Sequence, residues 1–135
     1  MENTINFGID LGTTNSAIAK FVKGEVIVFT NPQDYGRSTL PSVVSFKKDK
    51  ITVGSKAKEF QEKDPKSVIG IFKRKMGTSE SFKIKSTGES KSPIELSSLV
   101  LKELKTFVNT GDTLIPIPAF IRMILFSFII CSECF

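Results

Sequence analysis

The sequence predicts an α/β fold in which a β-meander comes first and short helices and one longer helix follow. Apolar and polar residues alternate over residues 5–11, which is typical of a strand with one buried face. Further segments of this kind come early in the chain, whereas apolar residues at helical spacing come late. The 135 residues are enough for one domain at most.

The early segments are expected to pair as consecutive strands. In the first segment Phe7, Ile9 and Leu11 fall on one side of an extended chain. Lys23-Gly24 predicts a short hairpin turn between two later segments. We expect strands near residues 5–11, 16–22, 25–30, 42–47 and 51–53.

Two short helical stretches are expected after these strands. Ser55 is predicted to cap a helix that runs to about residue 62, and Asp64-Pro65 to open an irregular helical stretch toward residue 75. Residues 78–91 lack helical apolar spacing. We therefore expect polar strands and loops there, with a turn at Gly88.

The longer helix is predicted to begin at a capping box. Ser92 and Glu95 have the spacing of that motif, and Pro93 occupies the first helical position. The helix is expected to run to about Val108 and to end at Gly111. Its buried stripe is predicted to consist of Leu96, Val100, Leu104 and Phe107.

The first strand leads into a motif, GIDLGTTNS at residues 8–16, with the chemistry of a phosphate site. Asp10 stands between Gly8 and Gly12, which have no side chains, so a ligand could approach the backbone on both sides. One carboxylate suits Mg²⁺, because that ion keeps most of its waters. At the bend, the amides and hydroxyls of Thr13 and Thr14 would converge on an anion.

An ordinary hairpin is the alternative interpretation of this motif, because turns are often rich in glycine and threonine. That interpretation explains Gly12 but not Asp10 within an apolar strand. Neither G-x-x-x-x-G-K nor G-x-G-x-x-G occurs in the chain. The phosphate hypothesis therefore rests on a hairpin and not on a helix N-terminus.

Four further motifs follow in order: RSTLPSVVSF at residues 37–46, VGSKAK at 53–58, FKRKMG at 72–77 and SPIELS at 92–97. With the first motif, they resemble the seventy-kilodalton heat-shock chaperones of the DnaK type, within the actin and sugar-kinase ATPase superfamily. The second motif has one residue inserted before its proline. The resemblance implies that the α/β fold is a partial actin-like, ribonuclease-H-like ATPase lobe.

The resemblance also implies roles for matching residues. Asp10 would act in catalysis by holding Mg²⁺ through water, and Lys73 would match the family's catalytic lysine beside the terminal phosphate and the attacking water. The alternative for Lys73 is a solvated charge in the run Lys73-Arg74-Lys75. The ATP-binding loop would consist of Gly12, Thr13, Thr14 and Asn15.

Composition excludes some functions and leaves others open. Histidine is absent from the sequence, which excludes Ser-His-Asp hydrolysis and histidine-ligated zinc. The formal net charge is +5, and basic residues with interspersed phenylalanines gather over residues 47–91, as in some single-stranded nucleic-acid binders. Because acidic residues are interspersed as well, we expect no nucleic-acid partner.

The first residues carry no basic leader region, so we expect a cytoplasmic protein. Cys131 and Cys134 form a C-x-x-C pair that we interpret as incidental, because redox motifs of that spacing need a following helix. Neither feature assigns a function.

The resemblance stops near residue 112, so we expect a partial nucleotide-binding domain at residues 1–112 and an aberrant hydrophobic tail at residues 113–135. Such a change of composition suggests a shifted reading frame, a truncated gene or a misassembled end. A membrane anchor is not expected, because the apolar run of about 17 residues is at the lower limit for a spanning helix and contains Arg122. Aggregation is the expected consequence of the tail.

Two functional hypotheses follow. The first is an N-terminal fragment of an ATP-dependent, stress-responsive chaperone, an ATPase by descent that is nearly inactive on its own. Its cofactors would be ATP and Mg²⁺; its partners would be ATP or ADP and, in a full-length form, unfolded polypeptides and co-chaperones. The second is a non-enzymatic, membrane-associated or aggregating remnant without nucleotide chemistry.

Overall fold

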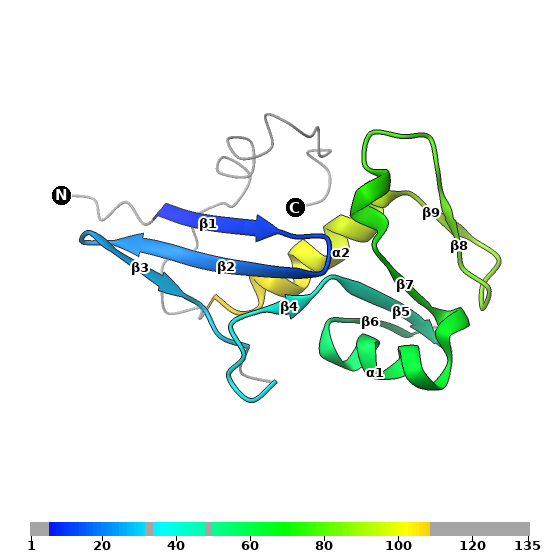
Figure 1. Cartoon of the computed structure of the whole chain (residues 1–135), viewed down its shortest axis with the longest axis horizontal. Helices are drawn as coiled ribbons and strands as arrows, with labels where there is room; N and C mark the ends of the chain where they lie inside the picture. Colours follow the sequence, from blue (N-terminus) through cyan, green and yellow to red (C-terminus); the bar gives the residue numbers. More distant parts are fainter. Residues whose placement is uncertain (1–5, 32–33, 48–49, 109–135) are drawn as a thin grey trace.

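The computed structural model describes residues 6–31, 34–47 and 50–108, and it has the mixed strand and helix content that the sequence predicts (Figure 1). The predictions for residues 113–135, with Cys131 and Cys134, lie outside the described residues. Three sheets contain the strands. The first consists of β1 (Asn6–Leu11), β2 (Asn15–Val22), β3 (Glu25–Val28) and β4 (Leu40–Pro41); the second of β5 (Val43–Lys47), β6 (Lys50–Val53) and β7 (Val68–Gly70); the third of β8 (Phe82–Lys83) and β9 (Ser90–Lys91).

The first sheet is the predicted meander. β1, β2 and β3 pair antiparallel in sequence order, and β4 pairs with the beginning of β2. Lys23 and Gly24 have φ angles of 50° and 85°, as a type I′ hairpin turn requires. The expected turn between β2 and β3 is confirmed, although β3 ends at Val28 and not near residue 30.

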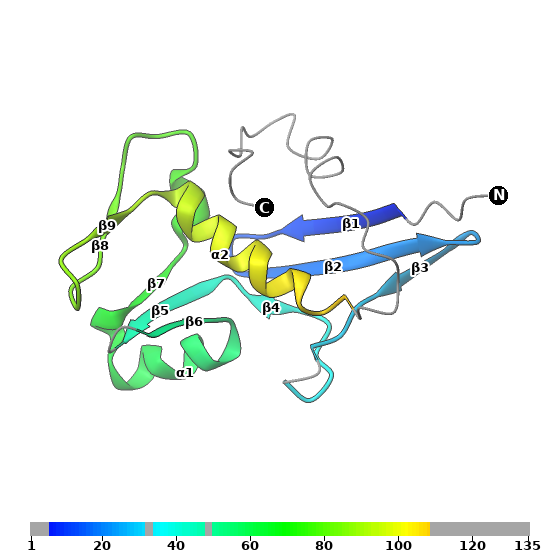
Figure 2. The same cartoon turned by 180° about the vertical axis from the view of Figure 1, so that it is seen from behind.

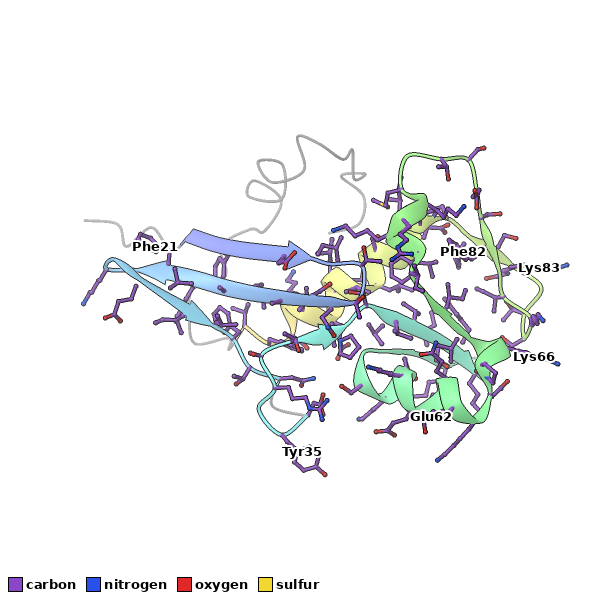
Figure 3. All side chains as sticks on the ribbon, in the orientation of Figure 1. Phe21, Tyr35, Glu62, Lys66, Phe82 and Lys83 are labelled. Atoms are coloured by element: carbon purple, nitrogen blue, oxygen red, sulfur yellow. The ribbon has the colours of Figure 1, made fainter. Side chains whose placement is uncertain are left out.

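The two faces of this sheet differ in cover. Phe7 and Ile18 are buried on one face, against which α2 (Pro93–Lys105) packs. The opposite face carries Asp10 and, further along, Phe21 and Val26, which are exposed. In Figure 3 the labelled Phe21 lies near the turn between β2 and β3, far from Lys83 on β8. The alternation in β1 therefore separates a core face from an open face.

Helix α2 begins as predicted. The Ser92 hydroxyl accepts a hydrogen bond from the Glu95 N–H at 3.2 Å, and the Ser92 N–H donates to the Glu95 carboxylate at 2.8 Å. Pro93 is the first helical residue. The predicted buried stripe is confirmed at all four positions: Leu96, Val100, Leu104 and Phe107.

The predicted end of this helix was wrong. Helix α2 ends at Lys105, before Gly111. The Glu103 carbonyl, which the N–H of Phe107 would need to continue the helix, instead accepts the N–H and the hydroxyl of Thr106. The Phe107 N–H donates to the Leu104 carbonyl, so the last turn tightens.

Helix α1 (Ser55–Lys63) packs against the second sheet, and α2 reaches the same sheet at β5 and β6 (Figure 2). Gly54 caps α1, so the prediction that Ser55 is the cap was wrong. The Ser55 hydroxyl donates instead to the carboxylate of Asp34, which leaves it no role at the helix terminus.

The expected helical stretch from residue 64 to residue 75 is interrupted by a strand. Two 3₁₀ helices, η1 (Pro65–Ser67) and η2 (Phe72–Lys75), flank β7, which pairs with β5. Three residues are too few for a periodicity to appear in the sequence. The expected turn at Gly88 is confirmed, since Gly88 has a φ of 77° in the loop between β8 and β9.

Ser45, in the centre of the second sheet, provides a test of core energetics. Its hydroxyl is fully buried and has no hydrogen-bond partner within the described part of the chain. An unsatisfied buried polar group costs about 1–3 kcal/mol, so we expect Ser45→Ala to raise the free energy of unfolding by about 1 kcal/mol. Urea denaturation measures this change.

Ser97→Ala is the control for that experiment. Ser97 is equally buried, but its hydroxyl donates to the sulfur of Met76 at 3.6 Å, so removing it should give no gain in stability. Equal effects of the two substitutions would contradict the prediction for Ser45.

Glu95 and Glu103, both on α2, should make the free energy of unfolding depend on pH in opposite directions. The hydrogen bond from the Ser92 N–H lowers the pKa of Glu95 below its ordinary value of 4.5; burial opposes this effect, and the Ser92 hydroxyl and Lys91 add to it. The stabilisation from the Glu95 charge is therefore present above pH 4.5 and is lost as the pH falls through the lowered pKa. We expect Glu95→Gln to cost about 0.5 kcal/mol at pH 7 and nothing at pH 2.5, measured by urea denaturation.

Glu103 is the matched comparison. Burial raises the pKa of Glu103, partly offset by Lys56, so its charged form destabilises the fold once the pH exceeds 4.5. Glu103→Gln should therefore stabilise the chain at pH 7 and lose that effect in acid. A loss of stability at pH 7 would refute this assignment.

Candidate functional site

The motif of residues 8–16 forms the end of β1, a tight turn and the beginning of β2. Asp10 lies opposite Ala17 in the register of these strands. Its side chain is exposed on the face that α2 does not cover. Within the described residues, the Asp10 carboxylate accepts no hydrogen bond and forms no ion pair. The acid is therefore free to meet a ligand.

The two glycines beside Asp10 differ in their surroundings. A Cβ added at Gly8 would meet nothing within 4 Å, so this side of Asp10 is open as the sequence predicts. A Cβ added at Gly12 would lie 2.1 Å from the carbonyl oxygen of Asn15. The interpretation of Gly12 as a second clearing was wrong, because the turn closes so tightly that the Asn15 backbone occupies this space.

In the backbone of the turn, two carbonyls are hydrogen-bonded within the chain and two N–H groups are not. The Gly12 carbonyl accepts the Ser42 hydroxyl at 2.8 Å, and the Thr14 carbonyl accepts the Ser42 N–H at 2.8 Å. The N–H groups of Thr13 and Thr14 donate to no acceptor in the part of the chain that the structure describes. Consecutive free N–H groups of this kind suit an anion.

Ser42 is the residue that the sequence analysis missed at this site. It lies 30 positions from Gly12, and no spacing rule connects them. The only sequence signal for Ser42 was its place in the second motif, in the pair Pro41-Ser42. That motif indicated a strand and not a contact with the turn.

Lys73 lies on η2, whose first residue, Phe72, is buried in the core. Lys73 is half-buried, whereas Arg74 and Lys75 are exposed and Lys75 pairs with Glu80 at 2.8 Å. The three basic residues are therefore not one solvated cluster. Lys73 therefore differs from Arg74 and Lys75 in its exposure.

The backbone just before η2 is strained. Ile71 has a φ of 59° and a ψ of 11°, the left-handed region that β-branched residues avoid. Its side chain is exposed, so burial of that side chain does not explain the conformation. This residue directly precedes Phe72, whose side chain is buried in the core, and Lys73 follows Phe72. Strain of this kind is concentrated at functional sites.

Helix α2 connects the turn to Lys73. It contacts both β2, which follows the turn, and η2, which carries Lys73. Asp10, Gly12, Thr13, Thr14 and Asn15 are close in sequence and lie together in one hairpin, whereas Lys73 lies on η2, a different element that contacts the same helix as β2.

The donor set fits a hydrated Mg²⁺ and a phosphate chain. One unpaired carboxylate with open space beside it is enough for an ion that retains most of its waters. Among the described residues, no three histidine, cysteine or acidic side chains gather as they would in a metal cage. In the same part of the chain, no helix is long and apolar enough to cross a membrane.

Comparison with known proteins identifies relatives over most of the chain. A family model described as Hsp70 protein matches residues 6–116. The chaperone protein DnaK of Mycoplasmoides gallisepticum is 39% identical over 126 residues, covering 87% of this chain and 21% of that protein. The chaperone protein DnaK of Ureaplasma urealyticum is 41% identical over 109 residues, covering 81% and 17%. The chain spans about a fifth of the length of these relatives.

The turn geometry predicts a large difference between two glycine-to-alanine substitutions. Gly12→Ala should destabilise the chain by about 2 kcal/mol or more, because the new Cβ would overlap the Asn15 carbonyl and no flexible side chain can move aside. Gly8→Ala should change the free energy of unfolding by less than about 1 kcal/mol. Urea denaturation of both variants measures this difference. A Gly12→Ala variant as stable as Gly8→Ala would show that the turn is not as tight as described.

Proposed function

Because the chain belongs to the Hsp70 family, we propose that its β1–β2 turn binds the phosphates of Mg-ATP. The observation that carries this proposal is the coincidence, at the end of β1 and in the turn that follows it, of an unpaired carboxylate with two N–H groups that have no acceptor among the described residues. We further propose that residues 1–112 are part of an actin-like nucleotide-binding lobe.

Each residue of the turn has a proposed role. Asp10 orders water molecules in the shell of the ion, and Thr13 and Thr14 donate their N–H groups to phosphate oxygens. Gly12 allows the turn to close, and Asn15 stands at its exposed end. Mg²⁺, when bound, supplies charge neutralisation between phosphates.

Lys73 is proposed to stabilise charge on the terminal phosphate. An ammonium group that is held in place before charge develops stabilises it more than a mobile one does. Its support is the position of Lys73 in η2, directly after the buried Phe72 and the strained Ile71. Arg74 and Lys75, being exposed, have no such proposed role.

The relatives are chaperone proteins, and we extend that role to the protein in which this chain acts. Its proposed activity is ATP-driven binding of unfolded polypeptides in the cytoplasm, with co-chaperones as partners. A single hairpin covers only one side of a nucleotide, so the 135-residue chain should bind Mg-ATP weakly and hydrolyse it little.

Calorimetry with Mg-ATP tests this function. We expect the chain to bind with a dissociation constant on the order of millimolar and Asp10→Asn to weaken binding about tenfold, because the carboxylate no longer orders the ion's waters. Thr13→Ala, which removes the hydroxyl, should weaken binding less. Glu59→Gln is the matched control, because Glu59 is an exposed acid on α1.

Two outcomes would refute the proposal. No binding by the unaltered chain at millimolar Mg-ATP would exclude the site, and equal effects of Asp10→Asn and Glu59→Gln would exclude a specific role for Asp10. For Lys73, the comparison is with its exposed neighbour: Lys73→Ala should weaken binding of ATP more than of ADP, whereas Arg74→Ala should affect both alike. Equal effects of the two substitutions would contradict the lysine assignment.

A further inference from the structure

Ser42 makes two hydrogen bonds to the turn from a buried position just after β4. Its hydroxyl donates to the Gly12 carbonyl, and its N–H donates to the Thr14 carbonyl, each at 2.8 Å. The side chain is almost completely buried. Ser42, which lies between β4 and β5, therefore holds two carbonyls of the turn in place.

A second hydroxyl, that of Ser16, belongs to this network, and the direction of its bond follows from the proton of the Ser42 hydroxyl. The hydroxyl oxygens of Ser16 and Ser42 are 2.8 Å apart, and either could be the donor. Ser42 has one hydroxyl proton, which it gives to the Gly12 carbonyl, so Ser16 must donate to Ser42. The hydrogen bonds therefore run from Ser16 to Ser42 and from Ser42 to Gly12.

The geometry of the peptide bond links this network to the ligand side of the turn. No cis peptide bond occurs in the described residues, and in a trans peptide the C=O and the following N–H point in opposite directions. Because the Gly12 carbonyl points to Ser42, the N–H of Thr13 points away from Ser42. A rotated peptide would instead present a carbonyl oxygen to the phosphates and repel them.

We propose that Ser42 is a positioning residue for phosphate binding: it holds the Gly12–Thr13 peptide in the orientation that directs the Thr13 N–H at the ligand. This inference rests on the proposed function and names a residue on which the affinity of that site depends. The pairing of Asn15 with Pro41 and of Ser16 with Leu40 already joins β2 to β4. The Ser42 hydroxyl is therefore not needed for that pairing, and its distinct effect is on the turn.

Amide NMR of the ¹⁵N-labelled 135-residue chain, titrated with Mg-ATP, tests this proposal. In the unaltered chain the Thr13 and Thr14 amides should shift with ligand. Ser42→Ala should raise the dissociation constant about tenfold, since one hydrogen bond no longer holds the peptide. Ser42→Cys, whose thiol is a weak donor of similar size, should give an intermediate value.

Ser16→Ala is the matched control. It removes a hydroxyl from the same buried network but leaves the bond from Ser42 to Gly12, so it should reduce stability without changing the affinity of the folded chain. Urea denaturation of each variant gives the folded fraction at the titration temperature, by which the affinities are corrected. If Ser42→Ala does not fold, the comparison of Ser42→Cys with Ser16→Ala decides.

The outcomes separate the two proposals. An affinity of Ser42→Ala or Ser42→Cys equal to that of the unaltered chain, or an equal loss in Ser16→Ala, would overturn the positioning role while leaving phosphate binding intact. Failure of the unaltered chain to shift its Thr13 and Thr14 amides would overturn phosphate binding itself, and the inference about Ser42 with it.

Discussion

Helix α2 packs one apolar stripe against both larger sheets, and the candidate site depends on this contact. Leu96, Val100 and Leu104 are fully buried, so the helix cannot turn about its axis without exposing a large side chain. Complete burial of a leucine or valine contributes about 1.5–3 kcal/mol, which makes the helix position difficult to change. Because β2 and η2 both pack on α2, the phosphate turn and Lys73 share one support.

The sequence predicted the parts of the structure that local rules determine. Alternation in β1 correctly placed Phe7 in the core and Asp10 outside it, and the Ser92 capping box correctly marked the beginning of α2. The prediction of the helix end failed because the Thr106 hydroxyl competes for a backbone carbonyl, an effect that composition does not reveal. The prediction of an irregular helical stretch from residue 64 toward residue 75 missed the strand β7, because β7 is stabilised by pairing with β5, which is remote in sequence.

In the candidate site, too, some features could be predicted from the sequence and others could not. The chemistry of Asp10 and of the threonines could be inferred from the motif, because the residue types alone place a carboxylate beside a turn with hydroxyls and backbone N–H groups. The tight closure at Gly12 and the hydrogen bonds of Ser42 could not, because both depend on distances between backbone atoms. Sequence patterns identify which groups are available, whereas tertiary hydrogen bonds determine where those groups point.

The register of β1 is the point at which core and site constrain each other. Side chains on a strand alternate between faces, so a slip of one residue would turn Asp10 into the core and Ile9 outward. The resulting unpaired carboxylate beneath α2 would be far more costly than the loss of one apolar contact. The bonds from Ser42 to both ends of the turn oppose such a slip from outside the hairpin. The same contacts that direct the Thr13 N–H outward therefore also keep the only acid of β1 on the open face of the sheet.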